Sequence, residues 1–296
     1  MLHPLLSDLP VRLERLDVGP GPLAVLRAGA GDRAPVLLVP GYTGSKEDFR
    51  LLLAPLAEAG HPVVALDQRG QFQSPGPDDL GAYAVDVLAQ DVLTVVAQLG
   101  GPVHLVGHSF GGLVARAAVL ADPSSFASLV LMGSGPAGLG GSRAALVGLM
   151  RPLLEQGMPA LVAAMDAMNA ADARHLALDA SVQGFLRERM LASSARGLLG
   201  MADGLVGEPD RVDELRDSGV PVLVLHGADD DAWAPALQAE MARRLGATHV
   251  VVADAAHSPA RHEHHRYRRA YTTHAPPPGT YPAIHWPHGQ RRRAAH

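Results

Sequence analysis

The sequence predicts an α/β protein whose core is a mostly parallel sheet flanked by helices. Three observations lead to this fold class. Short continuous aliphatic runs recur along the chain, as expected for strands buried on both faces. Stretches with helical spacing of apolar residues separate most of these runs, an alternation typical of parallel sheets with right-handed crossovers. One long stretch, 136–215, contains no such run and is helical by composition, which predicts an inserted helical cap.

The first two predicted strands form a hairpin. Residues 11–17 and 23–28 alternate apolar and polar side chains around a Gly-Pro-Gly-Pro turn, which predicts an antiparallel pair at a sheet edge. The later strands are short, largely aliphatic runs, so we expect each to be buried on both faces. These runs are 35–39, 63–66, 102–106, 128–132, 221–225 and 248–252.

Helices are predicted between the strands of the core. The stretch 46–59 is helical in pattern, and Ser45 can cap its beginning. In residues 82–99 the apolar side chains recur at helical spacing, which predicts one buried stripe. Two further helical patterns follow the strands 102–106 and 221–225. They cover 110–121 and 235–245.

The predicted cap divides the core in sequence. We expect a first core segment at 1–135, the cap at 136–215 and a second core segment at 216–260. The cap contains six of the nine methionines. Methionine at helical spacing usually fills a core, but in a cap above an active site it can also contact substrate. On this basis Met150, Met165 and Met168 are predicted to line a substrate pocket.

Composition sets limits on the function. The chain has 296 residues, of which 47% are apolar and none is cysteine. Disulfides, a thiolate nucleophile and cysteine-ligated zinc are therefore excluded. The beginning of the chain lacks a basic segment followed by a long apolar run, and no later run reaches about 18 uninterrupted apolar residues. We therefore expect a cytoplasmic protein without a membrane span.

The last 36 residues differ in composition from the rest. Residues 1–260 contain 18 basic and 29 acidic side chains, whereas 261–296 contains seven arginines, one glutamate and seven histidines, with no Leu, Val or Met. Such a segment cannot bury a core face. Three interpretations are open: a disordered tail, a metal- or polyanion-binding extension, or an out-of-frame translation of a GC-rich gene. We favour the third as a hypothesis, and resequencing the 3′ end of the gene would test it.

A nucleophile is predicted at Ser109. The sequence Gly107-His108-Ser109-Phe110-Gly111-Gly112 follows the strand 102–106 and opens the helix 110–121. A strand-to-helix turn this tight strains its central residue, and glycines remove the side chains that would clash. Ser109 would then project its hydroxyl from the carboxyl end of the strand, at a helix N-terminus that favours negative charge.

A serine hydroxyl needs a base and an acid that orients the base. The strand 248–252 leads to His257, which we predict as the base. The competing histidines are expected to be structural or unsuitably placed: His104 lies within a strand, His61 and His226 adjoin strands, His108 lies in the turn itself, and the others considered lie in the tail. The strand 221–225 leads to three consecutive aspartates at 229–231. No acidic residue follows the strand 128–132 before residue 142. We favour Asp230 as the acid and keep Asp231 as the alternative.

Two backbone amides are predicted to stabilise the oxyanion. One belongs to Phe110, directly after the nucleophile, and the other to Tyr42 in the loop that follows the strand 35–39. This glycine-rich loop could in principle bind phosphate. However, no strand is followed by GxxxxGK[ST], which argues against a P-loop nucleotide site.

Five segments together resemble the α/β-hydrolase fold family, in particular the members with a serine nucleophile and a helical cap. They are PGYTGS at 40–45, DQRGQFQSPGP at 67–77, GHSFGG at 107–112, HGADDDAWAP at 226–235 and AAHSP at 255–259. The resemblance implies a mostly parallel eight-stranded sheet, the triad Ser109, Asp230 and His257, and no cofactor or metal. Many relatives carry a histidine at the position of Pro40 and a glycine at that of Gln73, and most continue after the histidine with a helix.

The predicted function is hydrolysis of a carboxylic ester of a small to medium apolar compound through an acyl-enzyme. The same triad would also support a thioesterase, a lactonase or a carbon–carbon bond hydrolase. From another class, a non-catalytic binding member of the fold stays open. We expect a small-molecule substrate and no nucleic acid, because the acidic body would repel phosphate. The sequence makes no prediction of the oligomeric state.

Overall fold

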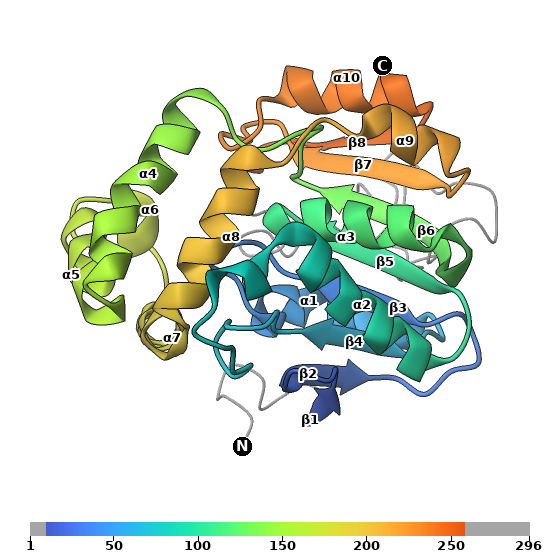
Figure 1. Cartoon of the computed structure of the whole chain (residues 1–296), viewed down its shortest axis with the longest axis horizontal. Helices are drawn as coiled ribbons and strands as arrows, with labels where there is room; N and C mark the ends of the chain where they lie inside the picture. The colour runs from blue at the N-terminus through green and yellow to red at the C-terminus, as the bar shows by residue number, and fades with distance from the viewer. Residues whose placement is uncertain (1–9, 258–296) are drawn as a thin grey trace, which may run out of the picture.

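The computed structural model describes residues 10–257 of the chain (Figure 1). It contains one eight-stranded sheet with the strand order β1-β2-β4-β3-β5-β6-β7-β8. The strands are β1 (Val11–Asp17), β2 (Pro22–Ala28), β3 (Val36–Val39), β4 (Val63–Leu66), β5 (Val103–His108), β6 (Phe126–Met132), β7 (Val222–Gly227) and β8 (Thr248–Val252). The predicted fold class is confirmed and the predicted strands are in place, because the buried strands are largely aliphatic. The expectation that the strand 248–252 is buried on both faces is wrong: β8 lies at the edge of the sheet, and its Val251 is 48% exposed.

The sheet is antiparallel only at one edge. β1 pairs with β2, and β2 with β4, in antiparallel register, as predicted for the hairpin. From β4 to β8 every pair is parallel, so the carboxyl ends of these strands meet at one edge of the sheet. In the centre, Leu38 of β3 lies opposite Ala65 of β4 and Val106 of β5.

Ten α-helices occur in the described residues. They are α1 (Arg50–Glu58), α2 (Val85–Leu99), α3 (Phe110–Ala121), α4 (Gly141–Glu155), α5 (Met158–Asn169), α6 (Ala173–Leu176), α7 (Ala180–Ala192), α8 (Ala195–Gly207), α9 (Val212–Asp217) and α10 (Pro235–Leu245). Short 3₁₀ helices occupy Lys46–Phe49, Leu80–Tyr83 and Pro123–Ser125. The predicted helix 46–59 is therefore a 3₁₀ turn continued by α1.

Helices pack on both faces of the sheet. Alternate residues of β3 face opposite sides: Val36 and Leu38 pack with α1, whereas Leu37 and Val39 belong to the cluster that contains α2 and α3. All four side chains are fully buried. This alternation on a strand that is apolar throughout explains why both faces carry a core.

Helices α4 to α9 lie between β6 and β7, in the part of the chain for which a cap at 136–215 is predicted, and α9 extends to Asp217. Helices α4 to α7 stand to the side of the sheet in Figure 1, and α8 returns along its edge. In contrast, α9 packs against α3 and α10 beside the sheet, with Val212 and Leu215 buried. The side chain of Arg116 on α3, 1% exposed, joins the two ends of the cap by donating to the carbonyl oxygens of Pro136 and Pro209.

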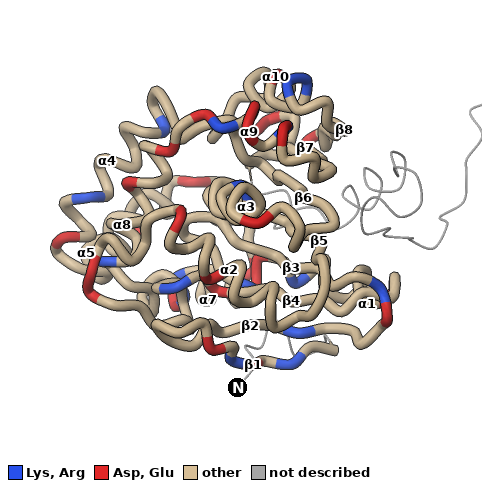
Figure 2. Tube along the Cα trace, turned by 45° about the vertical axis from the view of Figure 1, so that its right-hand side comes forward, with Lys and Arg blue, Asp and Glu red and all other residues tan. Residues whose placement is uncertain are grey.

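Charged side chains of both signs are interspersed along the described chain (Figure 2). Many of them pair at the surface; Arg244 of α10, for example, contacts Asp210 and Asp213 beside α9. No helix within residues 10–257 has the length and apolar character needed to cross a bilayer. The predicted tail, 261–296, lies outside the described residues.

Candidate active site

Ser109 occupies a strained turn between β5 and α3. Its backbone angles are φ 56° and ψ −122°, a conformation that costs a non-glycine residue energy. The turn is tight because α3 begins against β3: a Cβ atom added to Gly111 would lie 2.4 Å from the carbonyl oxygen of Val39. A side chain at this position would push the helix away from the sheet, so the glycine allows the close approach.

The structure brings Ser109, His257 and Asp230 together. Nε2 of His257 lies 2.9 Å from Oγ of Ser109, and Nδ1 of His257 lies 3.0 Å from Oδ1 of Asp230. The three residues follow β5, β8 and β7, whose parallel carboxyl ends meet at one edge of the sheet. The distances correspond to a hydroxyl, a base and an orienting acid in hydrogen-bond contact.

The carboxylate of Asp230 is buried and fully engaged. Oδ1 also accepts a hydrogen bond from the amide of Ala232 at 2.9 Å, and Oδ2 accepts one from the side-chain amide of Gln238 at 2.9 Å. Burial by itself would raise the pKa of the Asp230 carboxyl. The bonds from His257, Ala232 and Gln238 outweigh burial and hold this pKa below its usual value, which keeps Asp230 ionised next to the imidazole.

The structure distinguishes between the two candidate acids. Asp231 points away from His257 and pairs with Arg143 on α4, whose Nε also donates to the Asp231 carbonyl oxygen at 2.7 Å. The side chain of Asp231 is 49% exposed, whereas that of Asp230 is fully buried. Asp230 is thus the aspartate that contacts the imidazole, and Asp231 connects the cap to the same loop.

Two further rings surround His257. The ring of His108 lies 5.2 Å from that of His257, and its Nε2 is 3.0 Å from the His257 carbonyl oxygen. Trp233 is buried, with its ring 6.1 Å from the imidazole, and its Nε1 donates to the carbonyl oxygen of Ala137 at 2.9 Å. These contacts limit the movement of His257: His108 holds its backbone, and Trp233 packs beside its ring.

The loop after β3 passes beside the nucleophile. A Cβ atom added to Gly41 would lie 3.0 Å from Cβ of Ser109. The carbonyl oxygens of Gly41 and Tyr42 accept hydrogen bonds from Nε2 of Gln71, at 2.7 and 3.1 Å. Within residues 10–257 no acceptor takes the Tyr42 amide, and the Phe110 amide begins a helix, where amides lack an intrahelical acceptor. Both amides therefore lack a backbone acceptor within the described residues, and that of Phe110 directly follows Ser109 in the chain.

Sequence reasoning missed the glutamines that hold this loop. Gln71 and Gln68 are buried; Gln68 donates from Nε2 to the Pro40 carbonyl oxygen at 2.8 Å, and its amide binds Gln71 Oε1 at 3.0 Å. Both belong to the DQRGQFQS segment directly after β4. Polar side chains that follow a buried strand at the carboxyl edge were the signal that could have identified them.

A buried ion pair lies under the same edge. Lys46 Nζ is 2.8 Å from Oδ2 of Asp67, and both side chains are fully buried. Gln73, at a position where many relatives carry glycine, accepts from Lys46 Nζ at 2.9 Å. The ring of Phe72 lies 4.8 Å from this ammonium. These contacts give Gln73 a place in the packing of the loop rather than in contact with the triad.

The other strand-associated histidines have structural partners. Nδ1 of His104 is 2.8 Å from Oγ of Ser128, and Nδ1 of His61 is 2.7 Å from the carbonyl oxygen of Ala34. His226 contacts His249 through their Nε2 atoms, 2.8 Å apart. Among the described residues, no cluster of three or more His, Asp and Glu side chains could hold a metal ion. The tail histidines lie outside the described residues.

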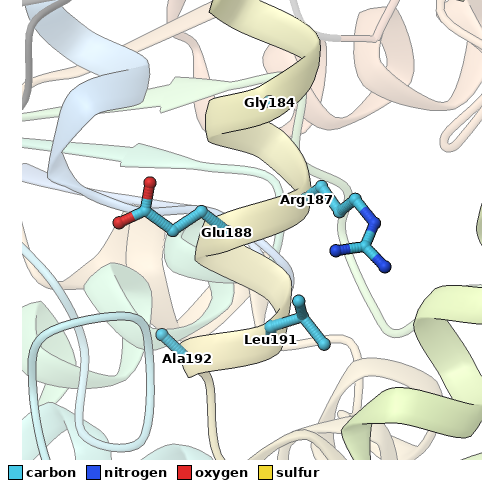
Figure 3. A pocket seen from close by; sticks show the side chains of 5 residues that line it. All are labelled: Gly184, Arg187, Glu188, Leu191 and Ala192. Atoms are coloured by element: carbon cyan, nitrogen blue, oxygen red, sulfur yellow. The ribbon is translucent and has the colours of Figure 1, made fainter.

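The predicted methionine lining is dispersed. Met150 and Met165 are half-buried against the core, while Met168 on α5 is 63% exposed. A surface groove of about 600 Å³ instead follows one stripe of α7 (Figure 3). It contains no residue of the triad. Its lining comprises Gly184, Arg187, Glu188, Leu191 and Ala192.

Comparisons with known proteins identify similar sequences. The sequence model of the alpha/beta hydrolase family matches residues 36–270. A non-heme chloroperoxidase from Streptomyces lividans is 32% identical over 219 residues, which cover 68% of this chain and 76% of the relative. A Variovorax paradoxus protein, provisionally named a carbamate hydrolase, is 44% identical over 105 residues, but the match spans only 39% of that relative.

A solved structure shows the same fold. It comes from work on the carboxylesterases of Nitrososphaera gargenis and superposes with a TM-score of 0.70 at 22% identity. The superposition covers 83% of this chain and 92% of the other. At this identity the likeness concerns the fold, not the substrate.

Proposed function

The chain belongs to the alpha/beta hydrolase family, and from that premise we propose that it is a serine hydrolase that cleaves a carboxylic ester of a small to medium apolar compound. One observation carries the proposal: Oγ of Ser109 lies 2.9 Å from Nε2 of His257, whose Nδ1 contacts the buried carboxylate of Asp230. A base held between a hydroxyl and an ionised acid is the arrangement that activates serine.

The first half of the reaction forms an acyl-enzyme. His257 takes the hydroxyl proton while Oγ of Ser109 forms a bond to the ester carbonyl carbon. The amides of Tyr42 and Phe110 stabilise the oxyanion of the tetrahedral intermediate. As the intermediate collapses, the bond to the leaving alkoxide breaks, and His257 donates its proton to that oxygen. Asp230 stabilises the imidazolium between these two transfers and keeps the ring in the required tautomer.

The second half of the reaction releases the carboxylic acid product. His257 deprotonates a water molecule, which attacks the acyl carbonyl carbon, and the same two amides stabilise the second oxyanion. Collapse breaks the bond to Oγ, and the proton returns from His257 to Ser109. The carboxylic acid leaves and the triad is restored. No step requires a metal ion or a redox cofactor.

Labelling of Ser109 tests the mechanism. A fluorophosphonate probe should modify the protein at Ser109, and Ser109→Ala should abolish both labelling and ester hydrolysis, with a loss of about 10³-fold or more in kcat/KM. A folded wild-type protein that resists the probe would refute the serine mechanism. A non-catalytic binding member of the fold would keep its function in Ser109→Ala, so the same variant separates the two classes.

The bond type is tested with a substrate panel. We expect p-nitrophenyl esters of short to medium acyl length to be the best substrates, because a serine hydroxyl in contact with His257 and Asp230 is suited to acyl transfer from an ester. Thioesters, lactones and vinylogous diketones would form the comparison arms. If kcat/KM for one of these exceeded that for every ester, the thioesterase, lactonase or carbon–carbon hydrolase alternative would replace the ester. The cytoplasmic location stays a prediction from the sequence.

A further inference from the structure

We propose that Gln238 on α10 is a positioning residue for the acid of the triad. Its side chain is fully buried, and the side-chain nitrogen Nε2 lies 2.9 Å from Oδ2 of Asp230. The same nitrogen lies 2.9 Å from the carbonyl oxygen of Trp233. Gln238 therefore connects the carboxylate to the loop between β7 and α10. The inference rests on the proposed serine mechanism, since it assigns a task within that triad.

The neighbours of Gln238 determine which way its amide points. Nε2 carries two N–H groups, and two acceptors lie within hydrogen-bond distance of it, one on Asp230 and one on Trp233. Turning the amide over would place Oε1 against a carboxylate oxygen and a carbonyl oxygen, both of which repel it. The observed orientation leaves Oε1 buried without a hydrogen-bond partner among residues 10–257. An unsatisfied buried acceptor lowers the stability of the fold. In this orientation, however, Nε2 can donate to both the Asp230 carboxylate and the Trp233 carbonyl oxygen.

The buried carboxylate of Asp230 is in contact with three hydrogen-bond donors. The amide of Ala232 and Nδ1 of His257 approach Oδ1, whereas Gln238 approaches Oδ2. Because the Asp230 side chain is fully buried, water cannot replace a missing donor at Oδ2. Gln238 thus fixes the plane of the carboxylate and leaves Oδ1 directed at the imidazole.

Both ends of α10, the helix that carries Gln238, have residues suited to their positions. Pro235 occupies the first position of α10, where a missing amide hydrogen costs nothing, and Gly246 ends the helix in a left-handed conformation with φ 62°. The carbonyl oxygen that Gln238 binds belongs to Trp233, whose ring lies 6.1 Å from that of His257. One amide therefore orients the acid and holds the residue that packs beside the base.

Two substitutions separate positioning from packing. Gln238→Met keeps the length of the side chain and removes both donors. Gln238→Glu keeps the shape but, when ionised, places a second negative charge against Asp230; when protonated, it can donate to Oδ2 again. Gln98→Met is the surface control: Gln98 on α2 is exposed and donates its side-chain amide to the Asp17 carbonyl oxygen at 2.7 Å, outside the triad network.

The measurements are the rate of fluorophosphonate labelling and the kcat and KM for p-nitrophenyl butyrate, with thermal unfolding at each pH. We expect Gln238→Met to lower kcat and the labelling rate about 10- to 100-fold with little change in KM, as expected for one hydrogen bond to a charged group. Gln98→Met should keep wild-type rates. The rate of Gln238→Glu relative to wild type should rise as the pH falls from about 8 to about 5, whereas the relative rate of Gln238→Met should not.

The possible results distinguish failure of the positioning role of Gln238 from failure of the serine mechanism. If wild type is labelled and both Gln238 variants keep wild-type kcat, or if the two variants share one pH dependence, the positioning role is overturned and the serine mechanism stands. If Gln238→Met does not fold, the pH dependence of Gln238→Glu decides. If wild type is not labelled at all, the serine mechanism fails. The downfield proton resonance of the bond between His257 and Asp230 then tests Gln238: a shift in either variant supports positioning, and an unchanged resonance overturns it.

Discussion

Replacing Arg116 by methionine should destabilise the protein and loosen the cap. The guanidinium of Arg116 is 1% exposed and is the shared donor for both ends of the cap segment. Nη1 donates to the carbonyl oxygen of Pro136 at the entry, while Nη2 contacts the Pro209 carbonyl oxygen at 3.1 Å and Oε1 of Glu208 at 3.3 Å at the exit. Methionine fills much of the same space but donates to none of these atoms.

The expected loss follows from the burial of the partners. Breaking a buried ion pair by removing one side costs about 3–5 kcal/mol, because the other charge is left uncompensated. The Glu208 side chain is 10% exposed and can turn partly toward water, so we expect the lower end, about 3 kcal/mol. For a domain of this size that corresponds to a fall in Tm of roughly 6–12 °C. The loss is a large part of the ~5–15 kcal/mol by which native domains are stable.

Urea unfolding and limited proteolysis would measure the effect. Arg151→Met is the matched control: Arg151 pairs with Asp203 on the cap surface, where the two side chains are 42% and 60% exposed, so its loss should cost about 1 kcal/mol or less. In Arg116→Met, cleavage of the folded protein should increase near residues 136–140 and 207–211. If Arg116→Met unfolded at the same urea concentration as Arg151→Met and showed no new cleavage, the inference that Arg116 joins the two ends of the cap segment would be wrong.

Two further predictions concern the acid of the triad and a buried histidine. Asp230→Asn should lower kcat/KM for p-nitrophenyl butyrate about 10⁴-fold, whereas Asp231→Asn should change it less than about 3-fold because Asp231 pairs with Arg143 at the surface; similar losses would contradict the assignment. Burial, followed by the neighbouring His61, lowers the pKa of His104 from 6.5 to about 4. Since the unfolded chain binds this proton and the folded protein does not, stability should decrease as the pH falls from about 6.5 to about 4. His104→Gln should flatten that part of the urea midpoint profile, and an unchanged slope would show that another group is responsible.

Local patterns were sufficient to predict the sheet. A strand that is buried on both faces is mostly apolar, so the aliphatic runs within β3, β4 and β7 are recognisable without any tertiary contact. The same holds in part for the turn at Ser109: a Cβ atom on Gly107 would lie 2.4 Å from the carbonyl oxygen of Gly111 within the same turn, whereas the need for glycine at 111 arises from its contact with Val39 of β3. Since parallel strands place their carboxyl ends at one edge, the approach of His257 to Ser109 also followed from the order of the elements.

Adjacent residues of the same type could not be separated in this way. Asp230 and Asp231 have identical chemistry, and only the path of the chain after β7 directs one toward His257 and the other toward Arg143. The methionines of the cap show a similar limit. Helical spacing indicates that one side of a helix is apolar, but not which neighbour covers it, and Met168 proved to be largely exposed.

The sequence by itself determined the fold class, the turn that carries Ser109 and the order of the residues proposed as the triad, because each depends on local conformation or on strand order. The tertiary structure decided which aspartate contacts the imidazole, that Gln238 supports it, and that Arg116 joins the two ends of the cap. These are contacts between side chains from separate elements. Their partners are chosen by the direction in which each side chain leaves its helix or loop, and that direction is set only when the elements pack.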